Sequence, residues 1–93
     1  MTFVREIHIS AFVEEHIWTK HRVTPEEVEE VCFSGPFVIR GRDKSIVVYG
    51  QTGTGRYLIV FLYPATKGLF RLATARDMES NERRRYRREK GGL

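Results

Sequence analysis

The sequence predicts a small α+β fold with two N-terminal helices, a four-stranded and mainly antiparallel sheet, and a basic C-terminal helix. The first observation behind this prediction is a pair of apolar runs at 57–63 and 69–75, which are rich in Val, Ile, Tyr and Phe. A link of only five residues separates them, which is typical of the two strands of a hairpin. The other two observations are a strong helix-start signal at Thr24 and an arginine-rich stretch over residues 80–90.

Length and composition indicate one domain over residues 1–93, with a single hydrophobic core. Cys32 is the one cysteine, so no internal disulfide is possible, and this favours a reducing, cytoplasmic location. No apolar run reaches the roughly 20 residues that a membrane helix needs. The N-terminus has no apolar stretch of the kind found in signal peptides. We therefore expect a cytoplasmic protein without a membrane partner.

Two helices are predicted ahead of the sheet. Residues 2–9 form a short strand or an extended lead-in, and Ser10 then caps a helix over 11–21. The second helix starts at Thr24-Pro25-Glu26-Glu27, where a cap residue is followed by proline and, three residues after the cap, by glutamate. This order is a capping box with the proline that helix starts favour. A Ser-Gly-Pro sequence at 34–36 ends the helix.

Four strands and a third helix follow. Short strands are predicted at 37–40 and 45–51, and a glycine-rich loop leads from the second of them into the run 57–63. Alternate residues of this run are apolar on both of its faces, so we expect it to be the central strand and to be covered on both sides. Short connections between neighbours favour antiparallel pairing. The basic helix begins at Asp77 or Ser80 and runs to about Lys90.

Charge is distributed unevenly along the chain. The net charge is +4, but residues 1–39 hold three Lys or Arg against seven Asp or Glu, whereas residues 40–93 hold thirteen against five. A basic second part predicts a polyanionic partner. The alternative interpretation is a basic helix that is only solvated.

Three common kinds of site find little support in the sequence. The glycines of the GQTGTG segment join two strands rather than a strand and a helix, so they indicate a hairpin loop and not a phosphate loop. His16 and His21 are separated by about 140° around a helix. No third ligand accompanies them, so we expect no metal site. We also expect no cofactor. Cys32 lies on the apolar face of its helix, where a thiol is usually inert.

What remains is a group of cations accompanied by candidate acid–base groups. RNA can be cut without a metal when its own 2′-hydroxyl attacks the adjacent phosphorus. Histidine has a suitable pKa for the two proton transfers, and the planar fork of arginine suits the phosphoryl oxygens. The candidate catalytic residues are His16, Lys20, His21, Arg56 and Arg76. The candidate RNA-binding residues are Arg71, Arg83, Arg84 and Arg87. The residues alone leave two alternatives open, since such arginines are often solvated or paired with a glutamate.

Four segments, taken in order, resemble a known family. They are Lys20-His21-Arg22-Val23-Thr24-Pro25-Glu26-Glu27, then Gly55-Arg56 at the start of a Val/Ile-rich strand, then Thr74-Ala75-Arg76, and then Glu82-Arg83 with Tyr86. Together they are similar to the BrnT family of toxins from bacterial type II toxin–antitoxin pairs. The resemblance implies a RelE-like fold, cleavage of mRNA by a metal-independent endoribonuclease, and a cytoplasmic location. It also implies a small DNA-binding antitoxin, BrnA-like, as the partner, and RNA as the substrate with or without a ribosome.

The chain departs from the family pattern at two places. An Asp-x-x-Lys-x-x-x-Asn pattern usually precedes the Lys-His pair, and here residues 11–17 read AFVEEHI instead. The family's glycine after Lys-His is Arg22 in this chain. Two other functions therefore stay open. One is a non-catalytic RelE/ParE-like toxin that inhibits a protein such as DNA gyrase, and the other is a plain RNA-binding domain.

Overall fold

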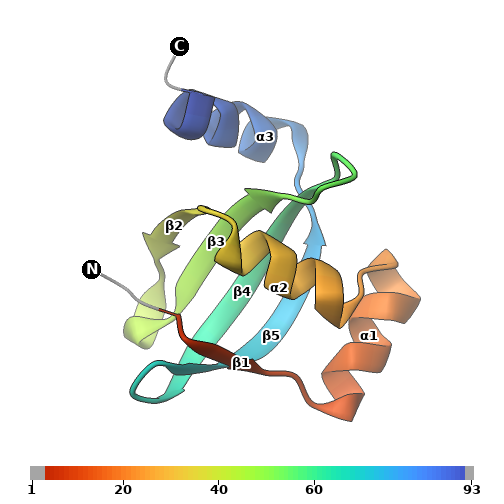
Figure 1. The fold of residues 1–93 in the computed structure, drawn as a ribbon, viewed down its shortest axis with the longest axis vertical. Coiled ribbons are helices and arrows are strands. Elements are labelled where there is room, and N and C mark those ends of the chain that lie inside the picture. Colours follow the sequence, from red (N-terminus) through yellow and green to blue (C-terminus); the bar gives the residue numbers. More distant parts are fainter. Residues whose placement is uncertain (1–3, 92–93) are drawn as a thin grey trace.

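A computed structural model describes residues 4–91, and Figure 1 shows a twisted sheet with helices α1 and α2 on one face and α3 beyond one end. The elements in chain order are β1 (Glu6–His8), α1 (Ala11–His21), α2 (Pro25–Phe33), β2 (Phe37–Arg40), a 3₁₀ turn (Arg42–Lys44), β3 (Ile46–Gln51), β4 (Tyr57–Thr66), β5 (Leu69–Asp77), α3 (Ser80–Tyr86) and a π-helical turn (Arg87–Gly91). The predicted α+β class and the three predicted helices are confirmed. No helix within residues 4–91 is long and apolar enough to cross a membrane.

The two N-terminal helices start where their caps predict. The Ser10 hydroxyl accepts a hydrogen bond from the Val13 amide at 3.1 Å. At the start of α2, the Thr24 hydroxyl accepts from the Glu27 amide, and the Glu27 carboxylate accepts from the Thr24 amide. These bonds satisfy amides that have no partner inside the helix, which is why the signal is readable from sequence alone.

The sheet has five strands in the order β1-β5-β4-β3-β2, so the expectation of four strands is wrong. The additional strand is β1, which pairs in parallel with β5 and places Ile7 opposite Phe70. The amides of Arg5 and Glu6 also donate to the Gly68 carbonyl. A strand of three residues carries little periodicity of its own, and this pairing reaches across about sixty positions of the sequence. The other pairings are antiparallel, as predicted.

The β4–β5 connection is tighter than predicted. The expected five-residue link reduces to a turn at Lys67 and Gly68, because residues 64–66 continue β4. Gly68 supplies the turn with a positive φ of 80°, which glycine adopts without a Cβ penalty. Pro64 is tolerated inside β4 because pairing with β3 stops at Leu62, so no neighbour on that side needs its missing amide.

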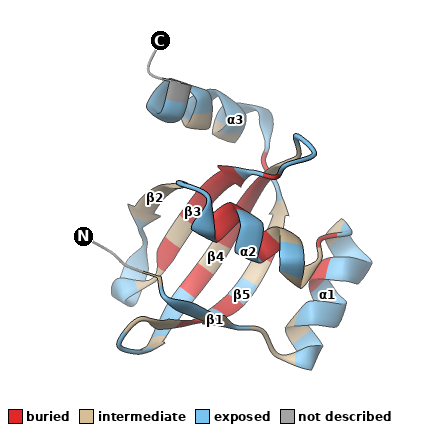
Figure 2. Ribbon diagram, viewed as in Figure 1, coloured by how far each residue is buried: buried red, intermediate tan, exposed pale blue. Residues whose placement is uncertain are grey.

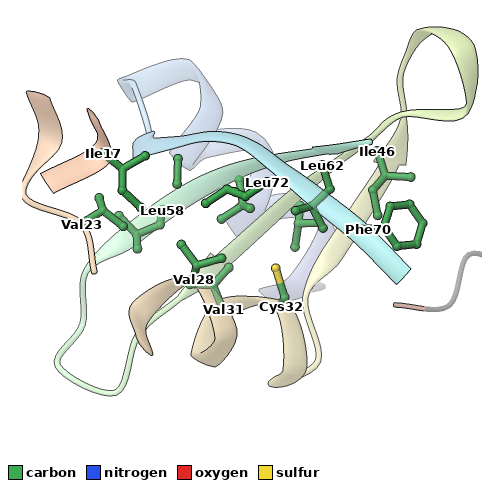
Figure 3. Packing of buried hydrophobic residues seen from close by; sticks show 13 residues of the cluster. Ile17, Val23, Val28, Val31, Cys32, Ile46, Leu58, Leu62, Phe70 and Leu72 are labelled. Carbon is green, nitrogen blue, oxygen red and sulfur yellow. The ribbon is translucent and has the colours of Figure 1, made fainter. Parts of the chain in front are cut away.

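β4 is the central strand, as predicted, and its two faces differ in burial. The inner face, which α1 and α2 cover, includes Leu58 and Val60, both fully buried. Ile17, Val23, Val28 and Val31 belong to the same buried cluster as these two sheet residues. Figure 3 shows the four side chains near Leu58, and Figure 2 shows the buried stretch of the sheet beneath α2. The outer face carries Tyr57, Ile59, Phe61 and Tyr63. Met78 and Tyr86 pack against its residues near α3, but Tyr63 remains 45% exposed. The expectation that β4 is covered on both sides is therefore wrong for the outer face, which is only partly covered and leaves aromatic side chains within reach of solvent.

Candidate functional site

Arg56 lies just before β4 and connects four segments of the chain. Its Nε donates to Asp77 Oδ1 at 2.8 Å, and its Nη2 donates to Asp77 Oδ2 at 3.1 Å. Nη1 donates to Glu27 Oε1 at 3.2 Å and to the Arg22 carbonyl at 2.6 Å, and Nη2 also donates to the His21 carbonyl. An arginine has five N–H donors, and all five of them are engaged here. We call this group of residues the Arg56 clamp.

The Arg56 clamp has clear electrostatic consequences. The hydrogen bonds from Arg56, opposed by partial burial, hold the pKa of Asp77 below its usual range, and the nearby charge of His21 acts in the same direction. The hydrogen bond to Asp77 likewise raises the pKa of Arg56. The carbonyls of His21 and Arg22 are the exposed C-terminal end of α1. By binding them, Arg56 ties the end of α1 to the start of α2 and to the sheet.

The geometry of the α1 end also explains the Arg22 position. Arg22 closes α1 in the left-handed conformation, with φ of 54° and ψ of 42°. Glycine is the residue that most readily ends a helix in this way. The BrnT-like pattern has glycine at the position of Arg22, and the backbone conformation at this position is one that glycine adopts most readily. The guanidinium of Arg22 lies 5.0 Å from the Trp18 ring, which offsets part of the cost of the conformation.

His16 and His21 lie close together on α1. Their ring centroids are 6.3 Å apart, with the planes at 73°. His16 and Lys20 also line an open hollow of about 280 Å³, whose other wall residues include Phe12. Phe12 is 80% exposed, so its ring faces solvent beside the histidine and the lysine. The structure therefore places two of the predicted catalytic residues, His16 and Lys20, in one hollow, which we call the α1 hollow. His21 lies next to His16 but is not among the residues that line it.

Neither metal binding nor thiol chemistry gains support from the geometry. Within residues 4–91, no group of three or more His, Cys, Asp and Glu side chains is arranged to hold a metal ion. Burial, with a smaller contribution from the charge of Glu29, raises the pKa of Cys32 to about 12. A thiol with this pKa stays protonated at neutral pH, so it is a poor nucleophile.

Arg76 lies away from the α1 hollow, on the outer face of the sheet. Its two Nη atoms donate to the two carboxylate oxygens of Glu82 at 2.9 and 3.0 Å, and its guanidinium lies 5.5 Å from the Phe61 ring. The hydrogen bonds from Arg76 are the main cause that lowers the pKa of Glu82. Glu82 also completes a capping box with Glu79 at the start of α3. Arg76 therefore anchors α3 to β5, and its contacts involve none of the residues of the α1 hollow.

The predicted RNA-binding arginines are all exposed, and they lie along the outer face and α3. Arg71 stands opposite Tyr63 in the β4–β5 register. Arg87 lies 5.3 Å from the Tyr57 ring, and Arg85 lies 5.6 Å from the Phe37 ring. None of these three arginines forms an ion pair within residues 4–91. The other two predicted residues, Arg83 and Arg84, lie on α3 with their side chains exposed.

Sequence reasoning missed several members of these groups. Asp77 and Glu27 were not recognised as the partners of Arg56, and Glu82 was not recognised as the partner of Arg76. Phe12 was not predicted to be exposed, and Arg85 was not among the candidate RNA-binding residues. For Asp77 and Glu27 no local signal exists, because their contacts with Arg56 span 21 and 29 residues of sequence.

Comparison with known proteins adds no assignment. No protein-family model and no curated protein matches this chain.

Proposed function

We propose that this chain is the toxin of a type II toxin–antitoxin pair and that it cleaves mRNA as a metal-independent endoribonuclease. The observation that carries the proposal is the pair of imidazoles, His16 and His21, whose centroids are 6.3 Å apart. His16 lines an open hollow together with Lys20, and His21 lies at its side. Two imidazoles at this spacing suit one phosphodiester group, since each then needs only a hydrogen bond of about 2.6–3.2 Å to its reacting oxygen.

In the proposed reaction, one histidine takes the proton from the 2′-hydroxyl as that oxygen attacks phosphorus. The bond from phosphorus to the 5′-oxygen breaks, and the other histidine gives its proton to this leaving oxygen. The products are a 2′,3′-cyclic phosphate and a 5′-hydroxyl, so protons and bonds balance without any cofactor. The ammonium group of Lys20 offsets the negative charge that grows on the phosphoryl oxygens. The exposed ring of Phe12 offers a stacking surface for a neighbouring base.

In this proposal Arg56 positions the catalytic residues and does not bind phosphate. All five of its N–H donors bind partners in the chain, and two of those partners are the carbonyls that end α1. Holding the end of α1 in place fixes the backbone that carries His21 and Lys20. Arg76, which is bidentate to Glu82, has a similar anchoring role for α3.

Two features support a RelE-like fold and the resemblance to BrnT toxins. The separate segments that carry the resemblance contact one another, since Arg56 binds Glu27 and Arg76 binds Glu82. In addition, Arg22 has the left-handed backbone that suits the family's glycine. On this reading the protein acts in the cytoplasm, alone or on the ribosome. A BrnA-like, DNA-binding antitoxin neutralises it.

One observation favours a second candidate, a toxin that binds a protein target such as DNA gyrase without cutting RNA. Both arginines predicted to bind phosphate, Arg56 and Arg76, are neutralised by carboxylates of the same chain. A plain RNA-binding domain would share the exposed arginines and lack only the reaction.

The test is RNA cleavage by the purified chain, with and without ribosomes, alongside RNA mapping after induction in cells. We expect cleavage in the presence of a metal chelator. His16→Gln and His21→Gln should each lower the rate by about 10²–10⁴, the usual contribution of a general acid or base. His8→Gln is the matched control, because His8 is exposed on β1, outside the hollow, and should retain full activity. If the parent chain cuts no RNA under any of these conditions, the ribonuclease proposal fails and the protein-binding candidate leads.

A further inference from the structure

A second hollow lies on the opposite side of the sheet from α1, between the outer face and α3. It has a volume of about 260 Å³, and its lining residues are Gln51, Tyr57, Tyr86, Arg87 and Lys90. They come from β3, β4, α3 and the π-helical turn, so only the folded chain assembles them. We call this the tyrosine hollow. Pockets for drug-sized ligands usually span about 300–1,000 Å³, so this one suits a group of the size of a nucleobase.

The walls of the tyrosine hollow combine three kinds of contact that nucleotides require. Tyr57 and Tyr86 present two rings with centroids 6.0 Å apart and planes at 73°. Gln51 stands directly opposite Tyr57 in the β3–β4 register, and its amide nitrogen donates to the Gly55 carbonyl, which leaves its oxygen to accept a hydrogen bond. Arg87 and Lys90 are exposed and form no ion pair within residues 4–91.

We propose that the tyrosine hollow binds one unstacked nucleotide of a single-stranded RNA. The base stacks on the tyrosine rings, the Gln51 amide contacts its polar edge, and Arg87 and Lys90 bind the adjoining phosphates. This inference rests on RNA as the ligand in the proposed function, and it adds a binding subsite that lies apart from the α1 hollow. Sequence-dependent RNA recognition commonly uses such splayed bases stacked on aromatic rings.

The surroundings favour RNA over an acidic protein segment. Cations alone would suit a row of carboxylates, but here arginines lie over aromatic rings twice, Arg87 at Tyr57 and Arg85 at Phe37. An arginine beside an aromatic ring brings its N–H donors close to any phosphate whose base stacks on that ring. Phe37 is partly exposed beside Arg85, so one further aromatic ring is open to a base on this face beyond the hollow.

The test measures binding of a short single-stranded RNA with 2′-O-methyl riboses, which cannot be cleaved because the attacking hydroxyl is blocked. Fluorescence anisotropy with the full-length chain gives the affinity. Tyr57→Leu and Tyr86→Leu should each weaken binding roughly 5- to 150-fold, the range for loss of one stacked base. Arg87→Gln should weaken binding and lower the slope of log K against log[salt] by about 0.7, which corresponds to one phosphate contact on a single strand.

Matched controls separate the hollow from general charge and from folding. Arg88→Gln removes the same charge from the next residue, but Arg88 lies outside the hollow and near Glu89, so its affinity should stay within about twofold of the parent. Tyr63→Leu removes a tyrosine from the same face of β4 outside the hollow and should also bind normally. Arg87 is exposed, so Arg87→Gln remains informative even where a tyrosine variant fails to fold.

Five ligands complete the experiment: the single strand, the same sequence as a duplex, a free nucleoside monophosphate, inorganic phosphate and a poly-glutamate peptide. We expect the single strand to bind best, and 2-aminopurine placed along it should be quenched at one position in the parent but not in Tyr57→Leu. Equal effects of Arg87→Gln and Arg88→Gln would overturn the inference. A higher affinity for the duplex or for a poly-glutamate peptide than for the single strand would also overturn it. If the parent chain cleaves RNA but the hollow variants bind RNA normally, only this inference fails. If binding depends on the hollow but the parent chain cleaves no RNA, only the ribonuclease proposal fails.

Discussion

Arg56 and Asp77 are joined by two parallel hydrogen bonds, from Nε to Oδ1 at 2.8 Å and from Nη2 to Oδ2 at 3.1 Å. The pair closes the end of the sheet where β4 begins and β5 ends. The remaining donors of Arg56 reach Glu27 at the start of α2 and the last carbonyls of α1. One guanidinium thus holds four segments, and its main effect is on the position of the helix that carries His16, Lys20 and His21.

Arg56→Ala should destabilise the domain by about 2–3 kcal/mol. Removing one partner of a buried pair typically costs 3–5 kcal/mol, and the lower figure reflects the 58% exposure of the Asp77 side chain. For a domain of this size the loss corresponds to a fall in Tm of roughly 10–20 °C, measurable by circular dichroism. Arg42→Ala is the control, because Arg42 is exposed in a turn without an ion pair in the described part of the chain. If Arg56→Ala and Arg42→Ala have the same Tm, the contacts of Arg56 do not stabilise the fold.

Acid should destabilise the domain through Asp77 and Glu82. Both carboxyls have a pKa below the ordinary value, because of hydrogen bonds from Arg56 and Arg76 respectively. A carboxyl with a lowered folded pKa contributes stability above its unfolded pKa, about 3.9 for Asp and 4.3 for Glu, and loses it as the pH falls through the folded pKa. Urea unfolding should therefore show this contribution intact above about pH 5 and declining below about pH 4.

The variants Asp77→Asn and Glu82→Gln provide the control for the acid effect. Each should be less stable than the parent at neutral pH and should lose less stability between about pH 5 and pH 3, because one linked carboxyl is gone. An unchanged pH dependence in both variants would assign the acid sensitivity to other groups.

Arg76→Ala should release α3 from β5 rather than stop catalysis. The bidentate contact with Glu82 is partly exposed, so we expect a loss of about 1 kcal/mol and a fall in Tm of several degrees. RNA affinity should fall as well, because Tyr86 and Arg87 of the tyrosine hollow follow Glu82 on the same helical segment. Cleavage of RNA that is already bound should be retained, which single-turnover kinetics at saturating protein would measure.

A double-mutant cycle with Glu82→Gln separates the two roles of Arg76. If Arg76 acts only through Glu82, the double variant should be no less stable than either single variant. A near-normal Tm with complete loss of single-turnover cleavage would instead make Arg76 a catalytic residue, as the sequence first suggested.

Local signals made most of the secondary structure predictable. The caps at Ser10 and Thr24 act within three residues of the helix start, and the apolar alternation of β4 depends on neighbours two positions away. The sequence left residues 2–9 open as a short strand or an extended lead-in, and the predicted four-stranded sheet did not include them. A strand of three residues, such as β1, is defined by its distant partner and not by its own pattern. The prediction also placed the end of β4 too early, because proline and threonine usually mark a loop.

The candidate site was predictable only as a set of residue types. Helical spacing placed His16 and Lys20 on one face of their helix, because they are four residues apart. It did not place His21 with them, since His21 is about 140° around the helix from His16. Arg56 and Arg76 were assigned to phosphate because the sequence does not show which carboxylates would engage them.

The sequence by itself determined the α+β class, the helix starts, the central strand and the basic character of the second part of the chain. These properties depend on interactions over a few residues or on composition. The tertiary structure decided which donors of Arg56 are occupied, that Arg76 faces away from the histidine pair, and that Gln51, Tyr57 and Tyr86 share one hollow. The contacts of Arg56 alone join residues 21 to 35 positions apart. Such contacts form only because burial of the apolar inner face of the sheet brings those segments together.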